Sequence, residues 1–154
     1  MYEIVNVHEY SGGLEACVTY IHSKWGGSDN YLYFFDAIVN SSLKQDHLPQ
    51  FYVLVIQKQI VGCYGIIIND FISRHDLYPW FSSLFIEVEH RGKRLSELMF
   101  EHAKKQVMAM GYANLYLTTD HVGFYEKFGW KRLNDGYEPS GERTKIYKQS
   151  LINI

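Results

Sequence analysis

The chain has 154 residues, of which 47% are hydrophobic and 21% charged, and these proportions are typical of a globular domain rather than of a disordered chain. The length suits one domain with its own core, so we expect a single domain over residues 1–154. The 15 basic and 17 acidic residues leave a net charge of −2, which gives no general attraction for nucleic acid. Aromatic residues make up 16% of the chain and favour either a thick core or an aromatic-lined pocket.

The cysteines and apolar runs indicate the compartment. The two cysteines, Cys17 and Cys63, are too few for a disulfide framework, and no C-x-x-C pair is present for zinc or redox chemistry. The first ten residues lack the basic and apolar regions of a signal peptide. The apolar runs are far shorter than the roughly 20 residues of a membrane helix. We therefore expect a soluble, cytoplasmic protein that has no membrane partner.

The N-terminal half predicts a strand, two helices and a hairpin. Residues 2–8 alternate as a strand does, and apolar residues at helical spacing predict a helix over 14–25. Asp29 or Asn30 is the expected N-cap of a second helix, whose apolar face carries Leu32, Phe35, Ile38 and Val39. After Pro49, two apolar runs predict strands over 51–56 and 60–68 with a turn at 57–59. Cys63 lies in the second run and is expected in the core.

The C-terminal half alternates strands and helices. A polar loop over 69–79 leads into an apolar strand, and helical periodicity from Leu95 predicts an amphipathic helix that Gly111 ends. The strands are expected at 80–88, 115–119, 129–133 and 143–152, with a short helix at 122–128 and turns at 134–141. The order βααββ-βαβα-ββ predicts an α/β (α+β) domain with one mixed sheet of about seven strands, flanked by about four helices.

A basic turn lies between a buried strand and the helix that starts at Leu95. The turn contains Arg91, Lys93 and Arg94. The N–H groups at a helix N-terminus lack partners within the helix, and the helix dipole adds partial positive charge there. Such a turn is suited to bind a phosphate group. A solvated basic surface is the alternative, although cations at this end of a helix oppose its dipole.

Residues 85–96 resemble the acyl-CoA motif of the GNAT superfamily of N-acetyltransferases, R/Q-x-x-G-x-G/A at a strand-to-helix turn. Residues 123–130, which read GFYEKFGW, resemble the second signature of the family, a Tyr-bearing short helix that leads into Gly-aromatic. The spacing of the two motifs and the order of the elements also match the family, whose central sheet is mostly antiparallel. Arg94 and Ser96 depart from the motif, because they stand where the family has glycine and a small residue.

The resemblance implies that acetyl-CoA is the co-substrate. Its pantetheine would pair with the free backbone of the strand before the turn, and its phosphates would lie at the turn. The residues implied in cofactor binding are Phe85, Ile86, Val88, Arg91, Gly92, Lys93, Arg94, Leu95, Ser96, Asp120 and Lys127. Because glycine at a phosphate-binding turn lets the ligand approach the backbone closely, we expect the Arg94 amide to face the phosphates while its side chain turns outward or clamps them. Asp120 is also the expected N-cap of the short helix.

The resemblance also implies direct attack of a primary amine on the thioester. Tyr125 matches the family Tyr and is expected to protonate the leaving thiolate. Some members use a strand Glu as the base, but residues 80–83 hold no carboxylate, so Asp76, His75 or a water relay is expected, with Asp76 first. The acceptor would be a primary amine of a small molecule or peptide, and Trp25, Tyr31, Trp80 and Ser82 are its expected contacts. Carboxylates beside aromatic rings suit a cationic amine.

A non-catalytic acyl-CoA-binding or regulatory module is the alternative, suggested by Arg94 and by the missing strand Glu. Nucleic-acid binding is not expected, because no basic stripe with interleaved aromatic residues is present. The seven histidines show no metal-ligand spacing, so no metal is expected. Dimers are common in the family, and a homodimer is compatible with this sequence.

Overall fold

The computed structural model describes residues 1–44 and 46–151, which fold around one mixed seven-stranded sheet. The strands are β1 (Glu3–Asn6), β2 (Gln50–Ile56), β3 (Gln59–Ile67), β4 (Trp80–Ile86), β5 (Asn114–Thr119), β6 (Lys131–Tyr137) and β7 (Arg143–Ser150). The α-helices are α1 (Leu14–Trp25), α2 (Tyr31–Val39) and α3 (Leu95–Ala109), and short 3₁₀ helices lie at η1 (Val7–Glu9), η2 (Val88–His90) and η3 (Tyr125–Phe128). The predicted fold class is confirmed.

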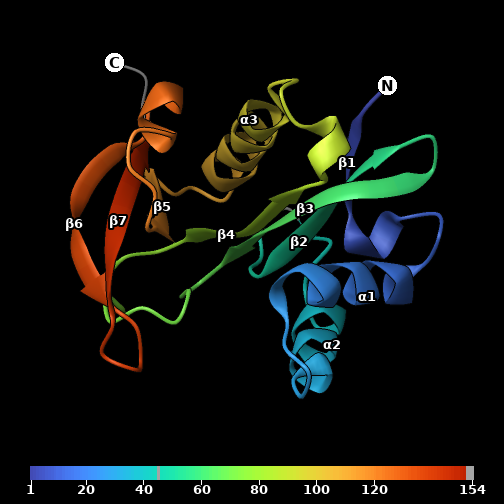
Figure 1. The fold of residues 1–154 in the computed structure, drawn as a ribbon, viewed down its shortest axis with the longest axis horizontal. Coiled ribbons are helices and arrows are strands. Elements are labelled where there is room, and N and C mark those ends of the chain that lie inside the picture. The colour runs from blue at the N-terminus through green and yellow to red at the C-terminus, as the bar shows by residue number, and fades with distance from the viewer. Residues whose placement is uncertain (45, 152–154) are drawn as a thin grey trace.

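The strands lie in the order β1-β2-β3-β4-β5-β7-β6, and every neighbouring pair is antiparallel except β4 and β5. Helix α3 covers one face of the sheet, while α1 and α2 cover the other (Figure 1). This three-layer arrangement follows from the sequence, since strands with two apolar faces need helices on both sides. The hairpin between β2 and β3 turns at Gln57 and Lys58, both with positive φ, as two-residue hairpin turns require.

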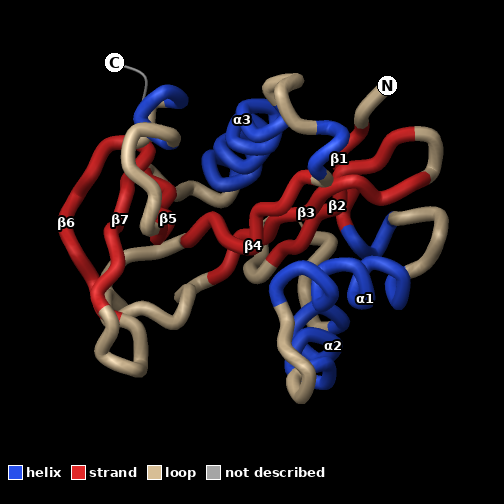
Figure 2. The backbone as a smooth tube through the Cα atoms, viewed as in Figure 1, coloured by secondary structure: helices blue, strands red, loops and turns tan. Residues whose placement is uncertain are grey.

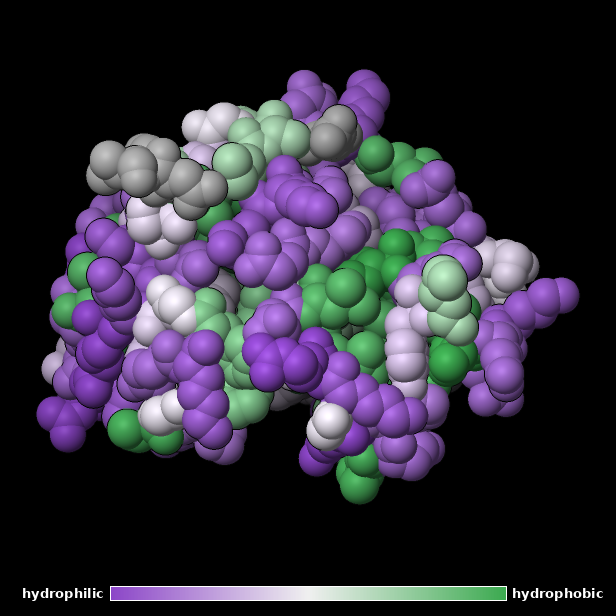
Figure 3. All heavy atoms as spheres, turned by 90° about the horizontal axis from the view of Figure 1, so that it is seen from above, coloured by the Kyte–Doolittle hydropathy of each residue, from purple (hydrophilic) through white to green (hydrophobic). Residues whose placement is uncertain are grey.

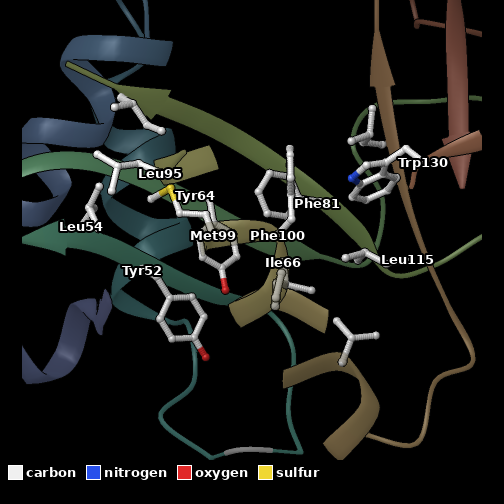
Figure 4. Packing of buried hydrophobic residues seen from close by; sticks show 14 of the residues in the cluster. Tyr52, Leu54, Tyr64, Ile66, Phe81, Leu95, Met99, Phe100, Leu115 and Trp130 are labelled. Atoms are coloured by element: carbon white, nitrogen blue, oxygen red, sulfur yellow. The ribbon is translucent and has the colours of Figure 1, made fainter. Parts of the chain in front are cut away.

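Much of the aromatic content forms a stack beneath α3. The rings of Tyr52 and Tyr64 stack at 5.2 Å between centroids, and those of Tyr64 and Phe81 at 4.8 Å. Phe100 of α3 extends the cluster to Trp130 through an edge-to-face contact, with a centroid distance of 5.6 Å. Figure 4 shows these rings lying together with Leu95 and Met99 of α3 above the strands. Aromatic pairs of this kind add to the stabilisation from burial, so this share of the aromatic excess belongs to the core.

A second core lies under α1 and α2. It contains Cys17, Ile21 and Ile38 from the helices, packed on Val53 and Cys63 of the sheet. Both thiols are fully buried, and burial raises the pKa of Cys17 to about 12, so it stays protonated at neutral pH. The predicted core position of Cys63 is confirmed.

Three details differ from the sequence-based predictions. Leu32 and Phe35 of α2 are exposed, because α2 is apolar nearly all round and its partly buried Phe34 faces the core instead. The helix predicted over 122–128 is reduced to η3, since Gly123 has a φ of +91° that no α-helix accommodates, and the described α-helices number three. Strand β6 continues to Tyr137 through residues predicted as turns. Ile152, the predicted end of the last strand, lies outside the described residues.

The loop between β3 and β4 crosses to the far end of the sheet. It runs to the β6–β7 hairpin (Figure 2), where the Ser73 N–H donates to the Tyr137 carbonyl over 2.9 Å and the Tyr137 N–H donates to Ser73 Oγ over 3.0 Å. These bonds fix the loop beside the hairpin, so residues just after β3 face residues just after β6.

The surface mixes apolar and polar residues. Seen from above, apolar side chains gather near the middle of the face and hydrophilic side chains surround them (Figure 3). Among the helices of residues 1–44 and 46–151, none has the length and apolar character to cross a membrane.

Candidate active site

Strands β4 and β5 separate in the middle of the sheet. Their parallel pairing is limited to one bridge, between Trp80 and Tyr116. Further along β4, the register with β3 shifts at Cys63–Gly65, and Ser83 has a φ of +58°, which marks a β-bulge that bends the strand. The backbone after the bulge still pairs with β3 through Gly62 and Ile86, while its other edge faces the opening between the strands.

A cavity of about 540 Å³ lies at this opening, beside the start of α3. We call it the α3 cavity. Its lining comes from β4, from the turn before α3 and from the segment that leads into η3: Leu84, Phe85, Ile86, Arg91, Gly92, Arg94, Leu95, Ser96, His121, Phe124, Tyr125 and Phe128. A strand edge, a helix N-terminus and aromatic side chains therefore meet in one hollow.

The turn before α3 offers an anion-binding terminus. Arg94 is the N-cap residue, and no side chain caps the helix, so the first N–H groups remain free for a ligand. The Arg91 guanidinium lies over the Phe85 ring and donates from Nε to the Ile86 carbonyl over 2.8 Å. These groups fit the phosphates and the amide-bearing arm of a coenzyme A molecule, which Arg91, the free α3 amides and the β4 edge would hold.

The α3 cavity brings together most, but not all, of the predicted cofactor residues. Val88 is 68% exposed and lies outside the lining, as do Asp120 and Lys127. Lys93 donates from Nζ to the Tyr2 hydroxyl over 3.3 Å. The prediction that Asp120 caps the short helix is wrong, because η3 starts only at Tyr125 and its N-cap is Phe124. The Asp120 carbonyl accepts a hydrogen bond from Lys145 Nζ instead.

Arg94 occupies the left-handed region, with φ 59° and ψ 31°. Its side chain is 73% exposed and pairs with Glu97, so it points outward, one of the two arrangements predicted. Glycine adopts this backbone conformation without the steric cost borne by other residues. The conformation explains why the motif has glycine at this place.

Replacing Arg94 with glycine is expected to raise the free energy of unfolding by about 0.5–1 kcal/mol, since relief of the left-handed strain outweighs an exposed ion pair. Urea unfolding measures the change. Lys93→Gly is the matched control, because Lys93 is not among the positive-φ residues of the described chain and glycine there only adds chain entropy. Equal destabilisation by both variants would contradict the prediction.

Tyr125 lies on the wall of the α3 cavity at the start of η3. Its ring packs on Phe100, with 5.8 Å between centroids, and on Tyr147 at 6.1 Å. Burial raises the pKa of Tyr125 above its ordinary value, and a side-chain hydrogen bond with Thr119 opposes part of that rise. The hydroxyl therefore stays protonated at neutral pH and is available as a proton donor.

A second cavity, of about 760 Å³, lies on the α2 side of the same opening. We call it the acidic cavity. Three carboxylates line it, Asp36 from α2, Asp70 from the loop after β3, and Glu138 from the loop after β6, and no Lys, Arg or His is among its described lining residues. Aromatic side chains complete the walls, namely Trp25, Tyr33, Phe34, Phe51 and Phe71.

The two cavities adjoin along both strands. On β4, Ser82 and Ser83 line the acidic cavity, and the next residue, Leu84, lines the α3 cavity. On β5, Thr118 lines the acidic cavity, and its neighbour Thr119 lowers the pKa of Tyr125 on the wall of the α3 cavity. The two cavities therefore border one another at the β4 bulge.

Two of the four predicted acceptor contacts line the acidic cavity, Trp25 and Ser82. Trp80 does not, because its ring is fully buried and its Nε1 donates to the Leu77 carbonyl over 2.7 Å. Tyr31 packs edge-on against His22 at 5.2 Å between ring centroids and also lies outside the lining. Both residues have structural roles instead.

Asp76, the predicted base, lines neither cavity. It is exposed and forms a 2.8 Å ion pair with Arg74, and that partner lowers the pKa of its carboxyl, which weakens it as a base. Asp70 has the opposite environment: burial, and secondly the charge of Glu138, raise its pKa to about 6.

The structure adds lining residues that the sequence analysis did not select. Asp70 was not selected within the polar loop after β3, and its place shortly after a buried strand is the sequence feature that could have singled it out. Phe124 and Phe128 flank Tyr125 in the second motif, and His121 follows the selected Asp120. Asp36 and Glu138 carried no sequence signal, because they meet only through folding.

The bulged β4, the uncapped N-terminus of α3 and the cavity between them fit a domain that binds an acyl-CoA. A family model described as "Acetyltransferase (GNAT) domain" matches residues 47–132, more than half of the chain, and the protein belongs to this family. The matched segment contains the β4 bulge, the turn before α3 and the Tyr125 segment.

Solved structures with the same fold cover nearly the whole chain. An aminoglycoside 6'-N-acetyltransferase complexed with coenzyme A is 14% identical, with a TM-score of 0.72 and coverage of 99% of this chain and 98% of that one. A GNAT family acetyltransferase from Elizabethkingia anophelis with acetyl-CoA bound is 10% identical, with a TM-score of 0.64 and 97% coverage of each chain. A chimera of the spermidine N-acetyltransferase from Vibrio cholerae and hSSAT is 15% identical, with a TM-score of 0.66 and coverage of 97% and 96%. No curated protein matches the sequence.

Proposed function

We propose that the protein is an acetyl-CoA-dependent N-acetyltransferase that transfers the acetyl group directly to a primary amine of a small cationic molecule or peptide. The observation that carries the proposal is the junction of the two cavities at the β4 bulge, between Ser83 and Leu84. The α3 cavity would hold acetyl-CoA and the acidic cavity the amine. Direct transfer needs both substrates to meet in one place, and this junction supplies that place.

The charge of the acidic cavity supports a cationic acceptor. Its three carboxylates attract ammonium groups, and its aromatic walls add cation–π contact. The similar structures named for aminoglycoside and spermidine acetylation act on amines, which agrees with this choice. Tyr125 would protonate the departing thiolate of coenzyme A, and a backbone N–H of β4 near Ile86 would stabilise the oxyanion.

An acceptor panel tests the proposal. Protein and acetyl-CoA are mixed with spermidine, an aminoglycoside, a lysine-containing peptide or glutamate, and free thiol is followed. We expect thiol release with the cationic amines and none with glutamate. Calorimetry measures acetyl-CoA binding separately, and its absence would overturn the proposal. Binding without thiol release over the whole panel would favour a non-catalytic acyl-CoA-binding module instead.

A further inference from the structure

Asp70 stands out among the carboxylates of the acidic cavity by its position. It lies three residues after the end of β3, in the loop that Ser73 and Tyr137 fasten to the β6–β7 hairpin. Ser82 and Ser83 of β4 line the same cavity. A carboxylate on this wall has access to an amine that binds in the cavity.

The surroundings of Asp70 leave its charge uncompensated. No hydrogen bond or ion pair to its carboxylate is found within residues 1–44 and 46–151. The titratable groups around it are Tyr33 and Asp36 from α2 and Glu138 from the β6–β7 side, so the nearby carboxylates are repulsive. A desolvated carboxylate without a cation binds protons and ammonium groups more readily than one in water.

The other two carboxylates of the cavity are less suited to this task. Asp36 and Glu138 are both exposed, and Asp36 already accepts a hydrogen bond from Asn40 Nδ2 over 3.1 Å. Water can solvate both charges, so they serve better to attract the acceptor than to take its proton.

We propose that Asp70 is the catalytic base, which receives the ammonium group of the acceptor and takes its proton. The inference rests on the proposed function. The ammonium N–H bond breaks and an O–H bond forms on Asp70. The free amine then attacks the thioester carbonyl, the C–S bond breaks, and Tyr125 protonates the thiolate and regains a proton from the acetylated nitrogen. Asp70 releases its proton to solvent, so the reaction yields amide, thiol and one proton.

The raised pKa of Asp70, about 6, suits this role. An alkylammonium group has a pKa near 10, so proton transfer to an ordinary Asp is uphill by about six units. The rise reduces that gap by about two units, which corresponds to about 100-fold in the population of free amine. Asp70 remains ionised above its pKa, so kcat/KM is expected to rise with pH through about 6.

The test compares the pH profiles of kcat/KM for wild type, Asp70→Asn and Asp70→Glu with spermidine and an aminoglycoside. We expect Asp70→Asn to lower kcat/KM at least 100-fold at neutral pH. The rise in kcat/KM near the wild-type Asp70 pKa should be lost in this variant. Its kcat/KM should approach the wild-type value as the pH nears the pKa of the amine. Asp70→Glu keeps a carboxylate and is expected to recover part of the rate. An unchanged Kd for acetyl-CoA shows that each variant is folded.

Two comparisons keep the outcomes distinct. Glu101→Gln, on the exposed side of α3, removes a carboxylate outside both cavities and is expected to retain wild-type rates. Asp76→Asn tests the competing base. If the rise of kcat/KM on the acid side of the pH profile is lost in Asp76→Asn but kept in Asp70→Asn, the assignment to Asp70 is overturned. If the wild type turns over and Asp70→Asn is equally active, this inference is overturned while the proposed function stands. Absence of wild-type turnover would overturn the proposed function and this inference with it.

Discussion

Tyr125→Phe is expected to lower kcat about 100-fold to 1,000-fold while the Kd of acetyl-CoA stays nearly unchanged. The variant loses only the hydroxyl, because the ring contacts with Phe100 and Tyr147 involve the aromatic ring itself. Burial keeps the pKa of Tyr125 above its ordinary value, so the wild-type hydroxyl carries its proton throughout the neutral range. Without it, the thiolate must leave unprotonated or take a proton from water, and either route raises the barrier.

Steady-state release of free thiol and calorimetric binding of acetyl-CoA measure the two quantities separately. Tyr112→Phe is the matched control, because Tyr112 is partly buried, packs edge-on against Tyr78 at 6.1 Å between ring centroids, and lines neither cavity. That variant is expected to retain the wild-type kcat. If affinity falls as much as turnover in Tyr125→Phe, the hydroxyl acts in binding. If neither changes, Tyr125 serves only to pack η3.

The sequence predicted the parts of the site that depend on neighbours along the chain. The turn before α3 and the Tyr125 segment are contiguous motifs. Periodicity predicted α3, and Gly111 predicted its C-terminal end to within two residues. For the Arg94 side chain the sequence left two arrangements open, outward or clamping the phosphates, and the structure has the outward one. Local rules of this kind need no knowledge of the tertiary structure.

The acidic cavity could not be predicted in the same way. Asp36, Asp70 and Glu138 lie on three separate segments and meet only because the β3–β4 loop is fastened to the β6–β7 hairpin. Trp80 was selected for its position before the central strand, yet the strand turns its ring into the core. Asp76 was selected as a substitute because residues 80–83 hold no carboxylate, yet it pairs with Arg74 within the same loop and lines neither cavity. Side-chain direction and long-range contacts decided each case.

The last prediction concerns stability. Asp70→Asn is expected to make the folded protein more stable at neutral pH, while it impairs catalysis. The folded-state pKa of Asp70 is raised from 3.8 to about 6, so the native protein binds the proton more tightly than the unfolded chain does. The cost of ionising Asp70 in the fold is therefore absent below pH 3.8 and fully present above about pH 6. About two pKa units correspond to at most about 3 kcal/mol, and solvent in the cavity reduces this to about 1–2 kcal/mol.

Urea unfolding at neutral pH and near pH 4 measures this effect. The gain in the free energy of unfolding from Asp70→Asn is expected to be full at neutral pH and to disappear near pH 4, where wild-type Asp70 is protonated in the fold. Asp76→Asn is expected to show the opposite sign at neutral pH, because the pKa of Asp76 is lowered by Arg74; the effect is small for an exposed pair. A destabilised Asp70→Asn protein at neutral pH would mean that its carboxylate has a compensating partner. A gain in stability combined with a loss of turnover is the trade-off expected of a residue that is strained for function.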